Sequence, residues 1–196
     1  GIISKDKAAV VVGGGLLGLE AAYGIAMHGI KTILVHRSGS ILSQQLDSTG
    51  GKLLQKNLEK YGIEFKLNTT ISEISGKEEV ETVTFSDGTS VESNLVIFAT
   101  GIIPNTALAK EATLATNKGI VVDDFLTTSD ESIFAIGECV EHSGNTYGLV
   151  APLYEQAKVL AKKLAGVKTE GYSGSTLSTR LKISGVDLFS AGDYLG

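Results

Sequence analysis

Cysteine occurs once in the 196 residues, at position 139. One cysteine excludes an internal disulfide framework, a Cys-x-x-Cys redox pair and a four-cysteine iron–sulfur site. It is typical of a reducing compartment, so we expect a cytoplasmic protein. No cysteine and histidine cluster has metal-ligand spacing, and no metal site is predicted. We expect Cys139 to be a small packed residue rather than a nucleophile, because no motif places a histidine beside it.

The chain also has no excess of basic charge and no long uninterrupted apolar segment. Its 17 Lys and Arg residues against 22 Asp and Glu residues give a net charge of -5. That balance gives no electrostatic reason to bind nucleic acid or an acidic membrane surface. The apolar stretch from Ala8 to Leu19 is interrupted by glycine and too short to cross a bilayer. We therefore expect neither a nucleic-acid nor a membrane partner.

A glycine-rich turn follows an apolar strand near the start of the chain, where residues 8–20 read AAVVVGGGLLGLE. In a dinucleotide fingerprint Gly13 permits the tight turn, Gly15 lets backbone amides approach a pyrophosphate, and Gly18 lets the helix lie close to the strand. The helix N-terminus adds unpaired amides and partial positive charge. A purely structural strand–turn–helix is the alternative. We predict an NAD(P)H site whose phosphate-binding residues are Gly13, Gly14, Gly15, Leu16, Leu17 and Gly18.

The end of the next predicted strand, residues 32–36, bears on the choice between NADH and NADPH. There a Rossmann fold that binds NAD has an acidic residue for the ribose hydroxyls. This chain has His36, Arg37 and Ser38 instead. The missing carboxylate removes the repulsion against a 2′-phosphate, and Arg37 with Ser38 offers groups that bind one. We predict a site for NADPH or for both coenzymes; the alternative is that His36 and Arg37 only cap a solvent-facing strand end.

Strand and helix signals alternate over the first hundred residues, which favours parallel βαβ units. Two β-rich runs flank Asp87-Gly88, a good hairpin signal. The predicted fold class is α/β, with a Rossmann-like parallel sheet and an antiparallel three-stranded meander. Predicted strands cover residues 8–12, 32–36, 63–67, 80–85, 89–92, 95–99 and 133–136, and predicted helices cover 15–27, 48–61 and 153–164.

Three ordered motifs together resemble the pyridine nucleotide–disulfide oxidoreductase family, in its branch without a redox disulfide. The family's V-V-G-G-G-x-x-G-x-E stretch is matched by Val11–Glu20. Its A-T-G-x-x-P-N crossing is matched by Ala99–Asn105, and its I-[FY]-A-x-G-[DE]-C strand end by Ile133–Cys139. The resemblance implies an NAD(P) domain inserted in an FAD domain, with hydride passing from the nicotinamide to the flavin.

Further motifs resemble one branch of that family, the large subunits of NAD(P)H-dependent nitrite reductases. Rubredoxin and ferredoxin reductases share the first three motifs and remain an alternative, as does a stand-alone nucleotide-binding or redox-sensing module without catalysis. The resemblance divides the chain into an NAD(P)-binding domain (1–103), a returning and incomplete part of the FAD-binding domain (104–166) and the start of a C-terminal segment (167–196). The branch motifs are Gln45–Asp47, Gly137–Cys139, Tyr147–Pro152, Ser178–Lys182 and Gly185–Asp187.

The resemblance also implies roles for individual residues. Glu20 takes the place of a catalytic group near the nicotinamide carboxamide and the flavin edge; the alternative is that it stabilises the start of the helix. Glu138 matches the acid that accepts a hydrogen bond from a ribityl hydroxyl of FAD, and Gly137 leaves room for that chain. The crossing contributes three more cofactor-binding residues: Thr100, Gly101 and Pro104.

The family begins with an FAD domain that bears its own glycine fingerprint, and nothing before Ala8 supplies one. Nitrite reductases continue into siroheme and iron–sulfur modules, which one cysteine cannot hold. We therefore expect a middle piece of a longer protein that is inactive alone. FAD is expected in the longer protein rather than held tightly here. The flavin and siroheme/iron–sulfur modules are the expected partners besides NAD(P)H, and homo-oligomerisation is left open.

Overall fold

The computed structural model describes residues 6–192, which form two compact units. The first unit comprises residues 6–101 and 178–192, and the second comprises residues 102–177. None of the helices between residues 6 and 192 combines the length and the hydrophobicity that crossing a membrane requires.

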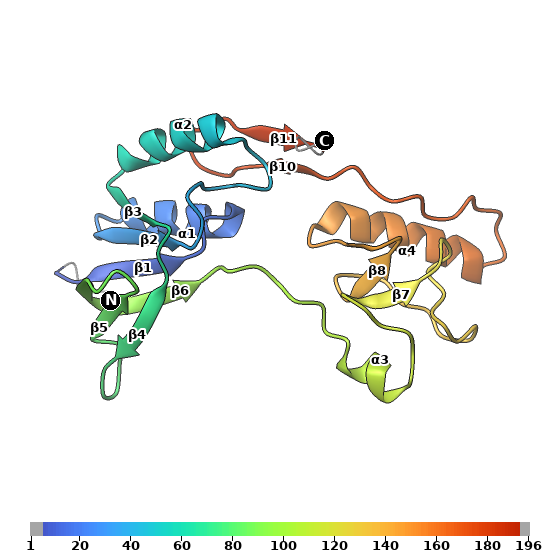
Figure 1. The fold of residues 1–196 in the computed structure, drawn as a ribbon. Helices are drawn as coiled ribbons and strands as arrows, with labels where there is room; N and C mark the ends of the chain where they lie inside the picture. The colour runs from blue at the N-terminus through green and yellow to red at the C-terminus, as the bar shows by residue number, and fades with distance from the viewer. Residues whose placement is uncertain (1–5, 193–196) are drawn as a thin grey trace. The chain divides into compact units, whose positions relative to one another are not determined.

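The first unit is built on one six-stranded sheet with the order β3-β2-β1-β6-β5-β4 (Figure 1). In this sheet β2 pairs in parallel with β3 and with β1, and β1 pairs in parallel with β6. The strands β4 and β5 form an antiparallel meander with β6. The predicted α/β class, with its parallel sheet and its meander, is confirmed. The elements are β1 (Ala8–Val12), α1 (Leu16–Ala26), β2 (Thr32–His36), α2 (Ser48–Glu59), β3 (Ile63–Leu67), β4 (Ile71–Ser75), β5 (Thr82–Phe85) and β6 (Ser90–Phe98).

One strand, β6, belongs to both parts of this sheet. Its first residues pair antiparallel with β5, and residues 95–98 pair in parallel with β1. The two strands predicted at 89–92 and 95–99 are therefore one continuous strand. The strand β4 was not predicted, because its ISEIS sequence carries only two apolar residues and is largely exposed.

The two faces of the parallel strands are covered by different layers. Val10, Ile33 and Val35 face the meander and pack with Val83 and Phe85. Val11 and Leu34 point to the opposite face, as the two-residue period of a strand requires. On that face they join a core of side chains from the helices and loops: Leu19, Ala22, Ile41, Leu42, Leu54 and Leu58.

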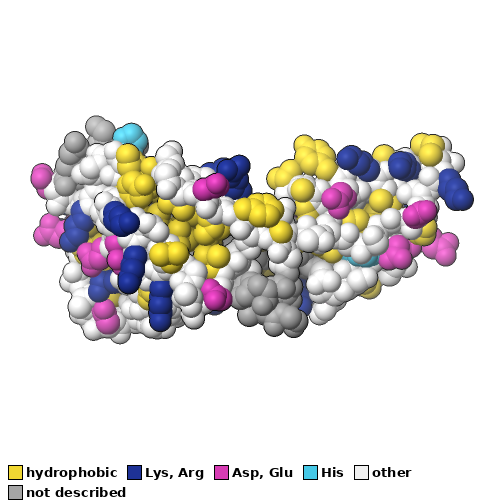
Figure 2. All heavy atoms as spheres, turned by 90° about the horizontal axis from the view of Figure 1, so that it is seen from above, with side chains coloured by type: hydrophobic (Ala, Val, Ile, Leu, Met, Phe, Trp, Pro, Cys, Tyr) yellow, Lys and Arg dark blue, Asp and Glu magenta, His cyan; other side chains and the backbone are white. Residues whose placement is uncertain are grey.

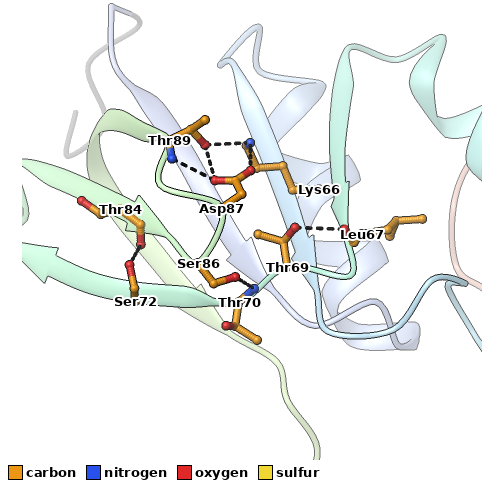
Figure 3. A network of polar contacts seen from close by, with 9 residues as sticks. All are labelled: Lys66, Leu67, Thr69, Thr70, Ser72, Thr84, Ser86, Asp87 and Thr89. Atoms are coloured by element: carbon orange, nitrogen blue, oxygen red, sulfur yellow. Dashed lines mark hydrogen bonds and ion pairs between the residues drawn. The ribbon is translucent and has the colours of Figure 1, made fainter.

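A polar network links β3 to the turn between β5 and β6 (Figure 3). Asp87 accepts hydrogen bonds from the backbone N–H of Thr89 at 2.9 Å and from its hydroxyl at 2.6 Å. Lys66 reaches from β3 and donates to both Asp87 and Thr89 at 3.0 Å. These bonds lower the pKa of Asp87 to about 2, with the Thr89 hydroxyl as the largest cause.

The C-terminal part of the first unit is a hairpin of β10 (Ser178–Arg180) and β11 (Phe189–Ala191), which we call the strap (residues 178–191). In Figure 1 it lies beside α2. Leu181 and Ile183 are only 2% and 4% exposed and belong to the same core as α1 and α2. The strap is thus an integral layer of this unit. The outermost residues of the chain, 1–5 and 193–196, lie outside the described residues.

The second unit packs one long helix on a small sheet with the order β7-β8-β9. Its core contains Val122, Leu126, Val140, Tyr147 and Tyr172. The predicted helix at 153–164 is confirmed and begins three residues earlier. The elements are α3 (Ala107–Glu111), β7 (Ile120–Val122), β8 (Val140–His142), β9 (Asn145–Thr146) and α4 (Val150–Leu164).

One predicted strand of this unit was wrong. Residues 133–136 form no strand and have a single isolated bridge, between Phe134 and Thr127. Ile133 and Ile136 are each 38% exposed, not buried on two faces. The physical reason is that an apolar run becomes a strand only when a neighbouring strand pairs with it, and none does among the described residues.

On the face drawn in Figure 2, acidic and basic side chains are mixed, with hydrophobic side chains between them.

Candidate functional site

The carboxyl ends of β1, β2 and β6 meet at one edge of the first unit. The Gly13 amide donates to the carbonyl of Val35 at 2.8 Å, and the Ala99 amide donates to the carbonyl of Val12 at 2.8 Å. The chain leaves β1 toward β2 on one side, whereas β6 lies on the other side. Such a reversal of strand order is where open α/β sheets bind their ligands, just outside the carboxyl ends of the strands.

Two glycines of the loop after β1 are required by the packing of the protein itself. A Cβ added to Gly13 would lie 2.2 Å from the carbonyl oxygen of Ala99, and the φ of +121° is also unfavourable for other residues. A Cβ at Gly18 would lie 1.9 Å from the carbonyl oxygen of Gly13. These two positions therefore hold β1, β6 and α1 close together, as the fingerprint predicts.

Gly15 differs from both, because nothing in the protein requires a glycine there. An added Cβ would meet no atom within 4 Å, and the φ of -84° with ψ of -177° is extended backbone that any residue adopts. Gly15 is the N-cap of α1, a position where side chains that accept a hydrogen bond are preferred. The lack of a side chain keeps the space in front of the helix open.

The start of α1 has no side-chain cap. The first turn contains no acidic residue, and the Gly15 N-cap has no side chain that could bond to them. The first amides of a helix have no partner within the helix and carry a partial positive charge, which suits an anion such as a diphosphate. Leu16 is half-buried and Leu17 is 73% exposed at the same end of the helix.

His36, at the end of β2, lies directly beside this loop. Its Nδ1 accepts a hydrogen bond from the Gly14 amide at 3.1 Å. A Cβ on Gly14 would come within 2.8 Å of the imidazole ring, so the ring and the glycine loop fit against each other. Burial lowers the pKa of His36, and the neighbouring charge of Arg37 lowers it further. Arg37 is exposed and Ser38 half-buried next to it.

The Glu20 carboxylate has a partner that the sequence did not indicate. Its Oε1 accepts a hydrogen bond from the backbone amide of Lys182 in the strap, at 2.9 Å. This hydrogen bond could not be predicted from the sequence, because its two residues are 162 positions apart and every residue except proline has a backbone amide donor.

The remaining predicted cofactor residues lie at the end of the first unit and in the second. Thr100 and Gly101 follow β6 and are exposed, and Gly101 has a φ of +97°. Pro104 is half-buried. In the second unit Gly137 has a φ of +105°, and an added Cβ there would meet no atom within 4 Å. Glu138 is exposed beside it.

Gln156, a fully buried residue of α4, was not among the predicted site residues. Its Oε1 accepts a hydrogen bond from the Gly137 amide at 3.0 Å and so holds the Gly137–Glu138 corner. A polar residue between Leu153 and Leu160, at the spacing of the buried helix face, was the available signal.

Between residues 6 and 192 no group of three or more His, Cys, Asp or Glu side chains could hold a metal ion. Cys139 is half-buried, with its Sγ 3.6 Å from the carbonyl oxygen of Ile136.

The chain is similar to a known protein family and to proteins of known function. The family model for pyridine nucleotide-disulphide oxidoreductases matches residues 2–162. An NAD(P)H nitrite reductase of Bacillus subtilis (strain 168) is 53% identical over 188 residues, which cover 96% of this chain and 23% of that protein. An assimilatory nitrate reductase electron transfer subunit of the same organism is 47% identical over 184 residues, which cover 94% of this chain and 24% of that protein. The chain thus spans about a quarter of the length of these relatives.

The fold is also found in solved structures. A crystal structure of an FAD-dependent pyridine nucleotide-disulphide oxidoreductase from Desulfovibrio vulgaris matches with a TM-score of 0.87 and 30% identity. The match covers 95% of this chain and 49% of that one.

Proposed function

This chain belongs to the pyridine nucleotide-disulphide oxidoreductase family, and on that premise we propose that its first unit binds NADH or NADPH for a larger flavoprotein. The diphosphate lies at the N-terminus of α1, and the adenosine half extends toward His36, Arg37 and Ser38. The nicotinamide half lies toward Glu20. Thr100, Gly101 and Pro104 shape the crossing into the second unit, where Gly137 and Glu138 serve the flavin.

The main support for the proposed coenzyme site is Gly15. Of the glycines in the fingerprint, Gly13, Gly14 and Gly18 are explained by close neighbours within the protein, whereas Gly15 is not. A glycine at an N-cap with open space in front of it is explained by a ligand that approaches the backbone. A diphosphate fits that place, because it carries negative charge and accepts hydrogen bonds from several amides.

The residues of this chain position the coenzyme and set its electrostatic environment. Gly13 and Gly18 hold the turn in place, so the amides of α1 are oriented before the ligand arrives. The helix end offsets part of the diphosphate charge. The cofactors carry the redox chemistry: when both are bound in the larger protein, the nicotinamide supplies a hydride and the flavin accepts it.

Gly137 and Glu138 form the part of the proposed flavin contact that lies in this chain. Gly137 is open to an approaching group and Glu138 is exposed beside it, so both residues fit the predicted ribityl contact. The neighbouring residues 133–136, however, have no paired strand. We infer that this chain supplies part of an FAD site and that the rest comes from elsewhere in the larger protein.

For the larger protein we propose an NAD(P)H-dependent nitrite reductase of the reducing cytosol, supported by the 53% identical relative. A subunit that passes electrons from NAD(P)H to another acceptor is the second candidate, because a relative described as an electron transfer subunit is 47% identical. Rubredoxin and ferredoxin are acceptors of that second kind. The gene of the larger protein distinguishes the two candidates, because only the first is expected to encode siroheme and iron–sulfur modules in the same chain.

Titration of the 196-residue chain with NADH and with NADPH, followed by nicotinamide fluorescence, tests the coenzyme site. We expect saturable binding with a Kd on the order of micromolar, as for a small ligand held mainly by its diphosphate. ADP should compete and adenosine should not, because only ADP carries the diphosphate that α1 would bind. Absence of saturation with both coenzymes would overturn the proposal.

A further inference from the structure

In the first unit the strap contacts Glu20, the residue that the proposed function places near the nicotinamide. Glu20 is the fifth residue of α1, one turn beyond the glycine loop. Its carboxylate is bonded at 2.9 Å to the Lys182 amide, although the two residues lie at opposite ends of the chain. The inference drawn here rests on the proposed coenzyme site.

The backbone of the strap is fixed on both sides of Lys182. Leu181 and Ile183 point inward and are almost fully buried in the core shared with α1 and α2. The amide of Leu181 donates to the carbonyl of Leu188 at 3.1 Å, within the hairpin. The side chain of Lys182 is exposed, which leaves its backbone amide as the group that meets Glu20.

The turn that follows is held by two tyrosines. The hydroxyls of Tyr23 from α1 and of Tyr61, just after α2, each lie 3.4 Å from the carbonyl oxygen of Ser184. Their rings meet edge to face, with centroids 5.0 Å apart. Gly185 completes the turn with a φ of +81°, and a Cβ there would lie 2.7 Å from the Tyr61 hydroxyl. The position of the Lys182 amide is therefore set by packing, not by Glu20 alone.

We propose that the backbone amide of Lys182 is a positioning group for the Glu20 carboxylate, and that it couples the strap to coenzyme binding. Glu20 lies one turn beyond the amides that a diphosphate needs, and side chains of a helix lean toward its N-terminus. A free Glu20 carboxylate would therefore repel the diphosphate, and the bond from the strap holds that charge in one place. The strap is thus linked to coenzyme affinity through one residue of α1.

A double-mutant cycle on the 196-residue chain tests this coupling. Lys182→Pro removes the amide hydrogen, and Lys182→Ala is the matched control that keeps it. With Glu20 present, Lys182→Pro should weaken NADH binding about fivefold, the effect of losing one hydrogen bond, while Lys182→Ala should leave the Kd unchanged. In a Glu20→Ala background, Lys182→Pro should have no further effect on the Kd. An equal loss in both backgrounds, or no loss in either, overturns the inference.

A second route does not depend on proline being tolerated at position 182. Gly185→Ala strains the turn and displaces it from Tyr61, while Lys182 and Glu20 are unchanged. It should weaken NADH binding only when Glu20 is present. By reciprocity, NADH should slow hydrogen exchange of the strap amides around Lys182, and Glu20→Ala should abolish that effect. If the parent chain binds no coenzyme, the proposed function fails; if it binds but shows none of these couplings, only the inference fails.

Discussion

The amide of Gly14 donates a hydrogen bond to Nδ1 of His36 at 3.1 Å. This bond requires Nδ1 to be without a proton, so the neutral imidazole carries its hydrogen on Nε2. Protonation would place a second hydrogen against the Gly14 amide and a positive charge beside Arg37. The glycine loop and the end of β2 are therefore joined by a group that can titrate near neutral pH.

This arrangement predicts that His36 makes the first unit less stable in mild acid. The pKa of His36 is lowered from 6.5 in the folded chain, so the unfolded chain binds the proton more readily. The contribution of neutral His36 to the free energy of unfolding is therefore fully present above pH 6.5. It is lost as the pH falls through the lower pKa that His36 has in the folded chain. Guanidinium unfolding at about pH 7.5 and about pH 5.5 should show this decline.

His36→Asn is the matched control for that prediction, because its Oδ1 can accept the Gly14 bond in place of Nδ1 but does not titrate. The variant should lose stability less steeply over the same interval. A decline as steep as that of the parent chain would show that other groups cause it.

Arg37→Ala should weaken NADPH binding more than NADH binding. Arg37 is exposed at the end of β2, where the acidic residue that excludes a 2′-phosphate is absent. Loss of a charge-assisted contact to that phosphate predicts about a tenfold larger Kd for NADPH. Lys31→Ala removes the same charge just before the opposite end of β2 and should affect neither coenzyme selectively. Equal losses for NADH and NADPH in Arg37→Ala would reject the phosphate contact.

Asp87→Asn should remove an acid-sensitive part of the stability of the first unit. The pKa of Asp87 is lowered from 3.8 to about 2, so its contribution is present above 3.8 and is lost as the pH falls through about 2. The variant should unfold at lower guanidinium concentration than the parent chain at about pH 6, and the difference should shrink toward about pH 2. A difference that does not depend on pH would contradict the role given to the Lys66–Asp87–Thr89 network.

Leu181→Ala tests whether the strap is part of the core of the first unit. Leu181 is 2% exposed, and truncation of such a side chain costs about 2–5 kcal/mol. Phe189→Ala in the same hairpin is the control, because Phe189 is 68% exposed and its loss should cost about 0.5 kcal/mol or less. Guanidinium unfolding compares the two variants. Similar small effects would mean that the strap does not stabilise the unit.

The sequence was sufficient for the parallel sheet because its signals are local. The apolar strand before Gly13 and the glycine spacing up to Gly18 predicted a turn, and the structure has atoms within 2.2 Å of the Cβ that either glycine would carry. The helix starting at Ser48 was also predictable, since Asp47 accepts a hydrogen bond from the Gly50 amide as an N-cap.

Non-local contacts account for what the sequence did not predict. Ile133–Ile136 has the composition of a buried strand, yet its pairing in residues 6–192 is limited to one isolated bridge, between Phe134 and Thr127. The bond between Glu20 and Lys182 depends on a hairpin that returns to α1 from the far end of the chain. The roles of the predicted site residues stay predictions until coenzyme binding is measured.

The most direct measurement is the NADH affinity of Gly15→Val beside that of Gly24→Val. Both glycines lie at α1 with open space around an added Cβ, so neither substitution should disturb the packing. Gly15→Val should remain folded, with at most the small loss of stability expected for Val in place of Gly at an N-cap. It should weaken NADH binding by about tenfold or more, because its side chain occupies the approach to the amides of α1. Gly24→Val should bind as the parent chain does. NADH binding by Gly15→Val with unchanged affinity would contradict the site.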